Sequence, residues 1–321
     1  MCPICQSGSE RKRLCGATLG GGSLFDLVEC PDCAVRYLSP DATPAQLEHF
    51  YRPQYYGTDW YKQQGWGAAF ARVVLKDYEP GRFLDVGCGL GYFIDGIRRQ
   101  TPAWEVSGVE LTSHAVEYAR RELRLDVRQG LLSEANFPSA HFDYIQIRNV
   151  LEHVTDPMSL LRECRRILKG TGTLHLFVPN GVTDSLNLIK FERETGRPGL
   201  SRSGHLFFFP RRALLRAFEA TGFRVERART SGIRRGLAVL GLWPHFKDWK
   251  RDYVAREDDN HSDAARDARD GATSDEPRIK LPPKKERPDL YYTYRQVRMN
   301  LRMLPGLREF GLDYELLLRP V

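Results

Sequence analysis

The sequence lacks any apolar run approaching the roughly 20 residues that a membrane-spanning helix needs. Its start, Met-Cys-Pro-Ile-Cys, also lacks the basic and then apolar pattern of a secretory signal. No internal repeat is evident. We therefore expect a cytoplasmic protein without a membrane span. Since 41% of its 321 residues are hydrophobic, a disordered chain is excluded, and one large domain with appendages or two domains are expected.

The nicotinamide fingerprint G-x-G-x-x-G is also missing, because Tyr92 stands where it requires glycine. Gly87, Gly89 and Gly91 nevertheless follow the apolar run 83–86 directly and precede an apolar helix start. Residues without a Cβ permit a tight strand-to-helix turn. Such a turn brings the backbone close to a bound cofactor, whose polar groups meet the first N–H groups of the helix.

An acidic residue follows the glycine turn at the expected distance. The next apolar strand, 106–109, ends at Glu110, about 20 residues beyond the turn. A carboxylate at the tip of the second strand can accept hydrogen bonds from both hydroxyls of a ribose. Further along, the pattern predicts a helix over 113–122, strands near Val127 and over 142–147, a helix over 157–168, and a strand over 174–178.

The block from about Arg82 to Asn180 resembles the class I S-adenosylmethionine-dependent methyltransferases, and is most similar to their small-molecule branch. The resemblance rests on LDVGCGLG (84–91), GVEL (108–111), FDYIQIRNVLEHV (142–154) and LRECRRILKGTGTLHLFVPN (161–180). It implies an α/β fold with a doubly wound, seven-stranded Rossmann-like sheet whose last strand is antiparallel. It also implies S-adenosylmethionine as the methyl donor.

The resemblance and the strand ends together predict which residues hold the donor. The glycine turn, the acidic strand tip, the backbone after the third strand and the end of the fourth strand all contribute. The predicted set is Asp85, Gly87, Cys88, Gly89, Gly91, Tyr92, Glu110, Leu111, Leu131, Leu132, Arg148 and Asn149.

Four of the seven cysteines have the spacing of a metal site. Cys2-x2-Cys5 and Cys30-x2-Cys33 are separated by 24 residues. Two such pairs complete a tetrahedral shell of four thiolates, which in a reducing compartment is typical of structural zinc. Paired redox cysteines are the alternative. With four protein ligands, the metal would have no open position for catalysis.

The residues after each pair depart from the common zinc knuckle, which has glycine there at positive φ. Gln6 and Ala34 occupy these positions, and alanine is strained at positive φ. We therefore expect a looser turn at Ala34. The order of second cysteine pair, strand, proline turn, helix and Tyr55-Tyr56 is similar to bacterial zinc-ribbon methyltransferases, including some sugar C-methyltransferases.

Two histidines are candidate catalytic bases, because an acceptor hydroxyl, carbon acid or protonated amine must lose a proton. His205 lies in a segment that related sugar C-methyltransferases place on the acceptor side, where a Glu-His pair has been assigned to acid–base work. Here Gly204 stands in place of that glutamate, so the pair is expected to be missing. His153 follows the fourth strand, and a structural role is the alternative for both. Tyr56 and Tyr61, in an aromatic-rich segment, are expected to line the acceptor pocket, with plain packing as the alternative.

The expected organisation has five parts: a zinc ribbon at 1–40, a helical lid or acceptor segment at 41–80, the donor-binding core at 81–232, an insertion at 233–311 with a mobile linker about 256–288, and the final core strand at 312–321. That strand should be antiparallel. The tyrosine- and arginine-bearing segment 291–303 suits either a substrate lid or self-association, which leaves a homodimer open.

The basic excess falls in the C-terminal part of the chain. Residues 200–321 carry 25 lysines and arginines against 17 acidic residues, whereas residues 1–199 carry 23 against 24. This suits a phosphate-bearing small-molecule acceptor, such as a sugar nucleotide, a polysaccharide precursor or a natural product. An RNA methyltransferase is the alternative, disfavoured by the nearly neutral ribbon and by Arg148-Asn149-Val150-Leu151 in place of an Asn/Asp-Pro-Pro-Tyr motif. A donor-binding partner protein without turnover is the third interpretation.

Overall fold

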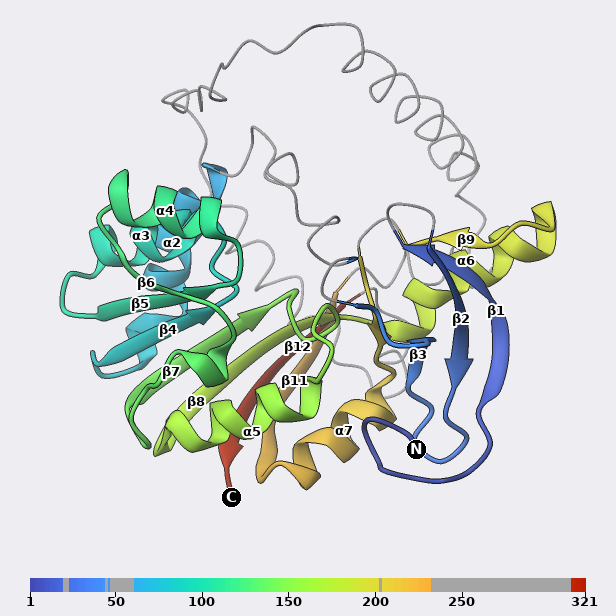
Figure 1. The fold of residues 1–321 in the computed structure, drawn as a ribbon. Coiled ribbons are helices and arrows are strands. Elements are labelled where there is room, and N and C mark those ends of the chain that lie inside the picture. Colours follow the sequence, from blue (N-terminus) through green and yellow to red (C-terminus); the bar gives the residue numbers. More distant parts are fainter. Residues whose placement is uncertain (20–22, 44–45, 47–60, 202–203, 232–312) are drawn as a thin grey trace, which may run out of the picture.

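The computed structural model describes residues 1–19, 23–43, 46, 61–201, 204–231 and 313–321. They form two β-sheets with helices packed around them (Figure 1). The predicted segment 233–311 and most of 41–60, including Tyr56, lie outside the described residues. Within the described part, no helix combines the length and the apolar character needed to cross a membrane.

The larger sheet has seven strands in the order β11-β12-β8-β7-β4-β5-β6. Neighbouring strands from β8 to β6 are all parallel, as the doubly wound prediction requires. The strand bounds are β4 Arg82–Val86, β5 Glu105–Glu110, β6 Asp126–Gln129, β7 Phe142–Arg148, β8 Leu168–Pro179, β11 Phe223–Ser231 and β12 Asp313–Pro320.

The final strand enters the sheet where it was predicted. β12 lies between β8 and β11 and is antiparallel to both, with Leu316 opposite Leu176 on one side and Ala228 on the other. Its side chains from Asp313 to Leu318 alternate between half-buried and buried, the period of a strand with one face on the core. The prediction of an antiparallel final strand after a long insertion is therefore confirmed.

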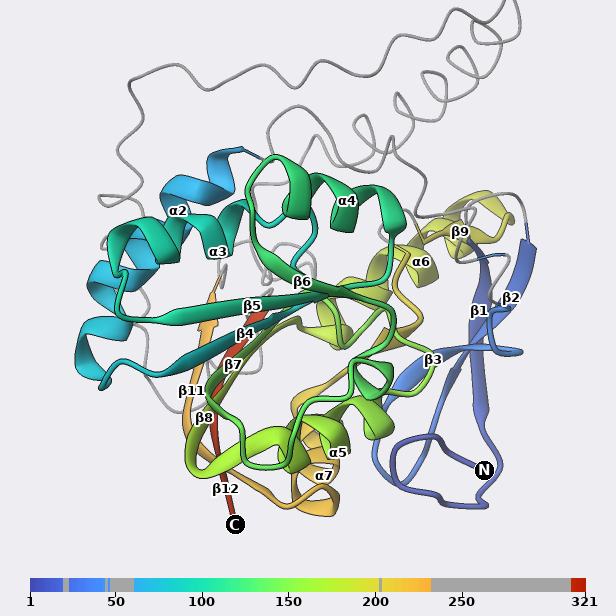
Figure 2. The same ribbon diagram turned by 60° about the vertical axis from the view of Figure 1, so that its left-hand side comes forward.

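Helices cover both faces of this sheet. α2, α3 and α4 lie on one face and α5 and α7 on the other (Figure 1, Figure 2). Each face has its own apolar cluster. The helix bounds are α2 Lys62–Val73, α3 Tyr92–Gln100, α4 Ser113–Arg121, α5 Pro157–Ile167, α6 Gly181–Thr195 and α7 Arg211–Ala220, with short 3-10 turns η2 Leu75–Asp77 and η3 Leu132–Glu134.

Local sequence explains where α5 and α6 begin. Asp156 caps α5 by accepting a hydrogen bond from the backbone N–H of Ser159 at 2.8 Å, with Pro157 in the first turn. Asn180 caps α6 in the same way, accepting from Val182 N–H at 3.1 Å. Gly196, with a φ of 69°, ends α6 in the left-handed conformation that glycine adopts most easily.

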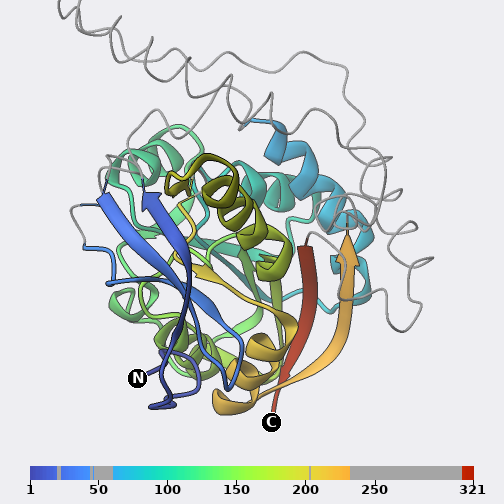
Figure 3. The ribbon, with the colours of Figure 1, turned by 90° about the vertical axis from the view of Figure 1, so that its right-hand side faces the viewer.

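The smaller sheet combines segments that are far apart in the sequence. Its order is β10-β3-β2-β1-β9, with β1 Lys12–Leu19, β2 Ser23–Glu29, β3 Arg36–Ser39, β9 Gly199–Leu200 and β10 Phe207–Phe208. The two outer strands thus come from the segment that follows α6 (Figure 3). Glu192 on α6 also accepts a hydrogen bond from the backbone N–H of Gly16 on β1 at 2.8 Å. The N-terminal ribbon is therefore built into the body of the protein.

Candidate functional site

The glycine turn joins β4 to α3 in the conformation that its sequence predicts. Gly87, Gly89 and Gly91 have φ values of 72°, 55° and 81°, all in the left-handed region. The backbone N–H of Gly87 bonds to the carbonyl of Val109 on β5 at 2.8 Å, which holds the turn against the next strand. The turn is therefore a fixed part of the sheet edge.

Glu110, at the end of β5, faces this turn. Its side chain accepts hydrogen bonds from Gly89 N–H at 3.0 Å through Oε2, and from Thr112 N–H and Oγ1, both at 3.0 Å, through Oε1. The residue is only 8% exposed. The carboxylate is thus held in one orientation at the tip of the strand.

A cavity of about 660 Å³ opens at the carboxyl ends of β4, β5 and β7. Ten of the twelve predicted donor-binding residues line it: Asp85, Gly87, Cys88, Gly89, Glu110, Leu111, Leu131, Leu132, Arg148 and Asn149. The other two lie outside its lining. Gly91 is the N-cap of α3, and Tyr92 is buried with its hydroxyl 2.6 Å from that of Tyr118. This is the edge of an open α/β sheet where ligands bind.

Charged residues lie in the wall of this cavity. Asp85 is buried and accepts a hydrogen bond from Gln146 Nε2 at 3.3 Å. Burial raises the pKa of Asp85 to about 6, although the nearby Arg148 guanidinium opposes the rise. Arg148 itself lies over the ring of Phe93, with Cζ 4.4 Å from the ring centroid.

Helix α2 closes one side of the cavity through Gln63 and Trp66. Tyr61, which the sequence placed in the acceptor pocket, precedes α2 and packs half-buried against the cluster of α2, α3 and α4. It does not contribute to the cavity lining formed by the described residues.

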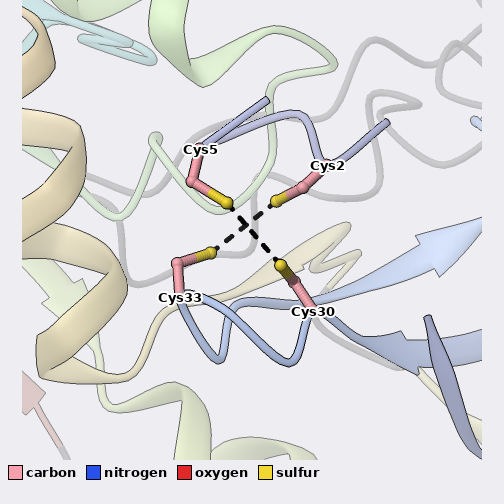
Figure 4. Close-up of side chains that lie close together, drawn as sticks. All are labelled: Cys2, Cys5, Cys30 and Cys33. Atoms are coloured by element: carbon pink, nitrogen blue, oxygen red, sulfur yellow. Dashed lines mark hydrogen bonds between the residues drawn. The ribbon is translucent and has the colours of Figure 1, made fainter. Parts of the chain in front are cut away.

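The four predicted metal-binding cysteines converge. Their sulfur atoms all lie within 4.8 Å of one another, with 3.7 Å between Cys2 and Cys33 and 3.6 Å between Cys5 and Cys30 (Figure 4). Sulfurs about 2.3 Å from one tetrahedral zinc ion are roughly 3.8 Å apart. The arrangement therefore fits a closed Zn²⁺ site, in which each of the two loops contributes two ligands.

The two cysteine loops have the same backbone conformation. Gln6 and Ala34 have φ values of 57° and 63°, and their N–H groups bond to the carbonyls of Cys2 and Cys30 at 2.9 and 2.8 Å. The expectation of a looser turn at Ala34 was wrong, because this residue adopts the left-handed conformation. Such strain persists where the surroundings fix the geometry, as four convergent thiols do.

The two candidate histidine bases meet in one buried cluster. The rings of His153 and His205 pack edge to face with centroids 4.7 Å apart. Oε1 of Glu152 lies 3.7 Å from His153 Nε2 and 3.9 Å from His205 Nε2. His153 also lines the donor cavity, so the cluster adjoins the cavity directly.

The cluster includes an acidic partner that the sequence did not indicate. Asp184, in the first turn of α6, places Oδ2 2.7 Å from Nδ1 of His205. Gly204 does replace the glutamate of the family's Glu-His pair, but a carboxylate from another element reaches the same histidine. The family's Glu-His pair is absent, and Asp184 gives His205 an acidic partner of a different origin. The sequence contains no motif that pairs Asp184 with His205.

Burial and neighbouring charges shift the pKa values of all three groups. Burial raises the pKa of Glu152 to about 8, and the charge of His205 opposes this rise. Burial also lowers the pKa of His153 to about 3, with His205 adding to the effect. Although burial opposes it, Asp184 raises the pKa of His205. Such shifted groups beside a cavity are typical of functional sites.

Comparison with known proteins gives the family. The model of the family described as "Methyltransferase domain" matches residues 60–228, more than half of the chain. A probable S-adenosylmethionine-dependent methyltransferase of Mycobacterium tuberculosis is 38% identical over 103 residues, which cover 32% of this chain and 37% of that protein. A ubiquinone biosynthesis O-methyltransferase of Actinobacillus pleuropneumoniae is 30% identical over 136 residues, 39% of this chain and 57% of that protein.

The chain thus spans between 37% and 57% of the length of these two curated relatives. Among solved structures, an S-adenosylmethionine-dependent methyltransferase from Archaeoglobus fulgidus matches with a TM-score of 0.46 and 15% identity, covering 84% of this chain and 100% of that one. A likeness of that size says nothing about substrate. The family match over residues 60–228 decides the matter: the chain belongs to the methyltransferase domain family, the class I S-adenosylmethionine-dependent methyltransferases.

Proposed function

We propose that this chain transfers a methyl group from S-adenosylmethionine to a small-molecule acceptor. The observation that carries the proposal is the position of Glu110, whose fixed carboxylate faces the glycine turn at the edge of the 660 Å³ cavity. A carboxylate at that place suits the two hydroxyls of a ribose. When bound, the donor supplies a methyl group already activated on a sulfonium, so the protein has chiefly to align it with the acceptor.

In this proposal the remaining lining residues bind the rest of the donor. Apolar contact with Leu131 and Leu132, together with their backbone N–H groups, would hold the adenine. The strand end at Arg148 and Asn149 would hold the amino-acid part, with Asp85 near its positive charge. Cys88 packs in the turn and is not a nucleophile, since the donor's methyl group passes directly to the acceptor.

The acceptor side would lie toward His153, beyond the donor's methyl group. As the acceptor's lone pair forms a bond to the methyl carbon, the bond from carbon to sulfur breaks and the donor leaves as S-adenosylhomocysteine. A hydroxyl acceptor must also release its proton, and we assign that proton to the cluster of His153 and His205 as the candidate base. The name of one compared relative, a ubiquinone biosynthesis O-methyltransferase, supports a small metabolite as acceptor.

We further propose that Cys2, Cys5, Cys30 and Cys33 bind a structural Zn²⁺. Four buried or half-buried thiols with the observed sulfur separations suit that ion, and the closed shell leaves no position for a reactant. The ion would fix the two loops that carry the ribbon. This assignment requires reduced thiols and hence a reducing compartment such as the cytoplasm.

The test is to incubate the purified chain with S-adenosylmethionine labelled in its methyl group and an extract of the source cells. The extract is then separated into small-molecule and RNA fractions. The proposal predicts label in the small-molecule fraction, where the mass of the product identifies the acceptor. Label confined to RNA would overturn the substrate class, and no incorporation with the donor bound would favour a partner protein without turnover.

A further inference from the structure

The cluster beside the donor cavity brings three possible metal ligands together from two segments of the chain. Glu152 and His153 follow β7, and His205 lies just before β10. One oxygen of Glu152 and one ring nitrogen of each histidine all lie within 4.8 Å of one another. Two ligand atoms about 2.1 Å from one ion and about 110 to 130° apart are roughly 3.4 to 3.8 Å from each other. The distances of 3.7 and 3.9 Å from Glu152 Oε1 to the two Nε2 atoms are close to that range.

The far side of each imidazole is held by an acceptor. Nδ1 of His205 lies 2.7 Å from the Asp184 carboxylate, and Nδ1 of His153 lies 3.2 Å from the carbonyl oxygen of Gly204. A carbonyl or carboxylate oxygen accepts, so Nδ1 must donate in both contacts. In the neutral form of each ring, the lone pair is then on Nε2, which is the atom nearer Glu152. A carboxylate or backbone carbonyl behind each ring is also the usual support of a metal-bound histidine.

Glu152 supplies the second, independent observation. Its side chain is buried, with the residue 1% exposed, and neither carboxylate oxygen has a hydrogen-bond partner among the described residues. A buried carboxylate without a donor is costly unless a charge compensates it. The contacts of 3.7 and 3.9 Å to the two histidines are too long for hydrogen bonds. Asp184 and Asp313 add further negative charge around it.

We propose that Glu152, His153 and His205 bind one divalent transition-metal ion through Glu152 Oε1 and the two Nε2 atoms. Two imidazoles and one carboxylate suit Zn²⁺, Fe²⁺ or Co²⁺ better than Mg²⁺, which prefers oxygen ligands. Three protein ligands leave open positions on the ion, unlike the closed cysteine site. Asp184 is a positioning residue that fixes the ring of His205.

The consequence for chemistry rests on the proposed function. His153 lines the donor cavity, so an ion beside it would bind an acceptor oxygen near the donor's methyl group. A bound cation lowers the pKa of an oxygen that it ligates. The ion, and not a histidine base, would then promote loss of the proton from a hydroxyl acceptor. The released proton would pass to water. An acceptor with a hydroxyl, and preferably a second oxygen next to it, fits such a site.

The test measures metal binding without donor or acceptor, so it does not depend on methyl transfer. The full chain is stripped with a chelator, titrated with CoCl₂, and then equilibrated with ZnCl₂ for metal analysis. The expected wild-type result is two equivalents per chain. One gives a thiolate-to-cobalt charge-transfer band from the cysteine site, and the other gives only weaker visible bands.

Variants assign the second equivalent. His205→Ala and Glu152→Gln should each lose the second metal equivalent and keep the thiolate band. Cys30→Ser should lose the thiolate band and keep the second equivalent. Asp184→Asn should weaken the second site about 10- to 100-fold. His141→Ala, whose histidine packs against Phe137 and Phe142, is the matched control and should keep two equivalents.

The near-isosteric Glu152→Gln guards against misfolding of the alanine variant, and the thiolate band reports that the chains with changes at residues 152 and 205 are folded. A wild-type chain that binds one equivalent, with a cobalt spectrum unchanged by His205→Ala, would overturn the proposal. Glu152 would then lie beside His205, whose pKa Asp184 raises, and beside a neutral His153 without an ion between them. Loss of methyl transfer with two equivalents still bound would count against the proposed function instead.

Discussion

Glu110 accepts a hydrogen bond from the backbone N–H of Gly89 at 3.0 Å, which links the end of β5 to the turn after β4. These two residues are 21 positions apart and belong to neighbouring parallel strands. The bond orients the carboxylate along the rim of the cavity instead of leaving it free in solvent. The donor would therefore meet a preformed ribose site rather than a mobile side chain.

Replacing Glu110 by alanine should weaken donor binding about 10- to 100-fold, because hydrogen bonds to a charged group contribute about 1.5 to 3 kcal/mol. Isothermal titration calorimetry with S-adenosylmethionine gives the dissociation constants. Glu117→Ala, on the exposed side of α4 where Glu117 pairs with Arg121, is the control and should bind like the wild type. If the Glu110 variant and the wild type bound S-adenosylmethionine with equal affinity, the proposal that Glu110 binds the ribose would be contradicted.

Asp85 predicts a particular pH dependence of stability. Its pKa is raised to about 6 by burial, so the folded chain holds the proton more tightly than the unfolded chain does. The wild type should therefore lose stability as the pH rises from about 4 to about 6. Asp85→Asn cannot titrate and should escape this loss, which corresponds to about 3 kcal/mol for a shift of about two pKa units.

Urea unfolding of both proteins at pH 4.5 and pH 7.5 measures this difference. Between the two pH values, the free energy of unfolding should fall further for the wild type than for Asp85→Asn. The variant therefore gains stability relative to the wild type at the higher pH. The same dependence on pH in both proteins would show that Asp85 is not held in a low-dielectric setting.

Gly67 allows α2 and α3 to lie in backbone contact. A Cβ at Gly67 would be 1.9 Å from the carbonyl oxygen of Phe93, and one at Gly96 would be 2.0 Å from that of Gln64. Gly67→Ala should therefore separate the helices and lower the free energy of unfolding by about 1 to 3 kcal/mol or more. Donor affinity should fall too, because Gln63 and Trp66 on α2 line the cavity.

The matched control is Gly170→Ala, at a glycine whose added Cβ would have no heavy atom within 4 Å. It should change the free energy of unfolding by less than about 0.5 kcal/mol. Thermal unfolding and donor titration of the two variants side by side give the comparison. A Gly67 variant as stable as the Gly170 variant would mean that the helices are not packed as described.

Cys30→Ser should remove the metal from the cysteine site and destabilise the smaller sheet. Binding of structural zinc can provide on the order of 10 kcal/mol of folding free energy in small domains. Metal analysis and the melting temperature give the two readouts. Cys15→Ala, at a buried cysteine of β1 whose pKa burial raises to about 11, should keep the metal. A Cys30 variant that keeps a full equivalent of thiolate-bound metal would contradict the assignment.

Much of the fold follows from local patterns. Strand runs and the glycine turn between residues 82 and 180, with the family resemblance that they carry, predicted the parallel sheet and an antiparallel final strand at 312–321. The cysteine cluster was predicted as well, since two C-x2-C pairs define the ligand set by spacing alone. These features are readable because each depends on neighbouring residues.

Other features depend on contacts between distant segments and leave no local signal. β9 and β10 are two residues long, too short for any periodicity, yet they complete the sheet of the N-terminal ribbon. Asp184 reaches His205 only because α6 packs beside the loop that carries this histidine. The close crossing of α2 and α3 at Gly67 could not be predicted from the sequence either, since a glycine within a helix can have many structural roles.

A crystal structure of the chain with S-adenosylhomocysteine bound tests the donor site most directly. We expect the ribose hydroxyls within hydrogen-bonding distance of Glu110, the adenine beside Leu131 and Leu132, and the sulfur directed toward His153. A product molecule bound elsewhere, or a cavity that stays without ligand at saturating concentration, would contradict the proposed donor site.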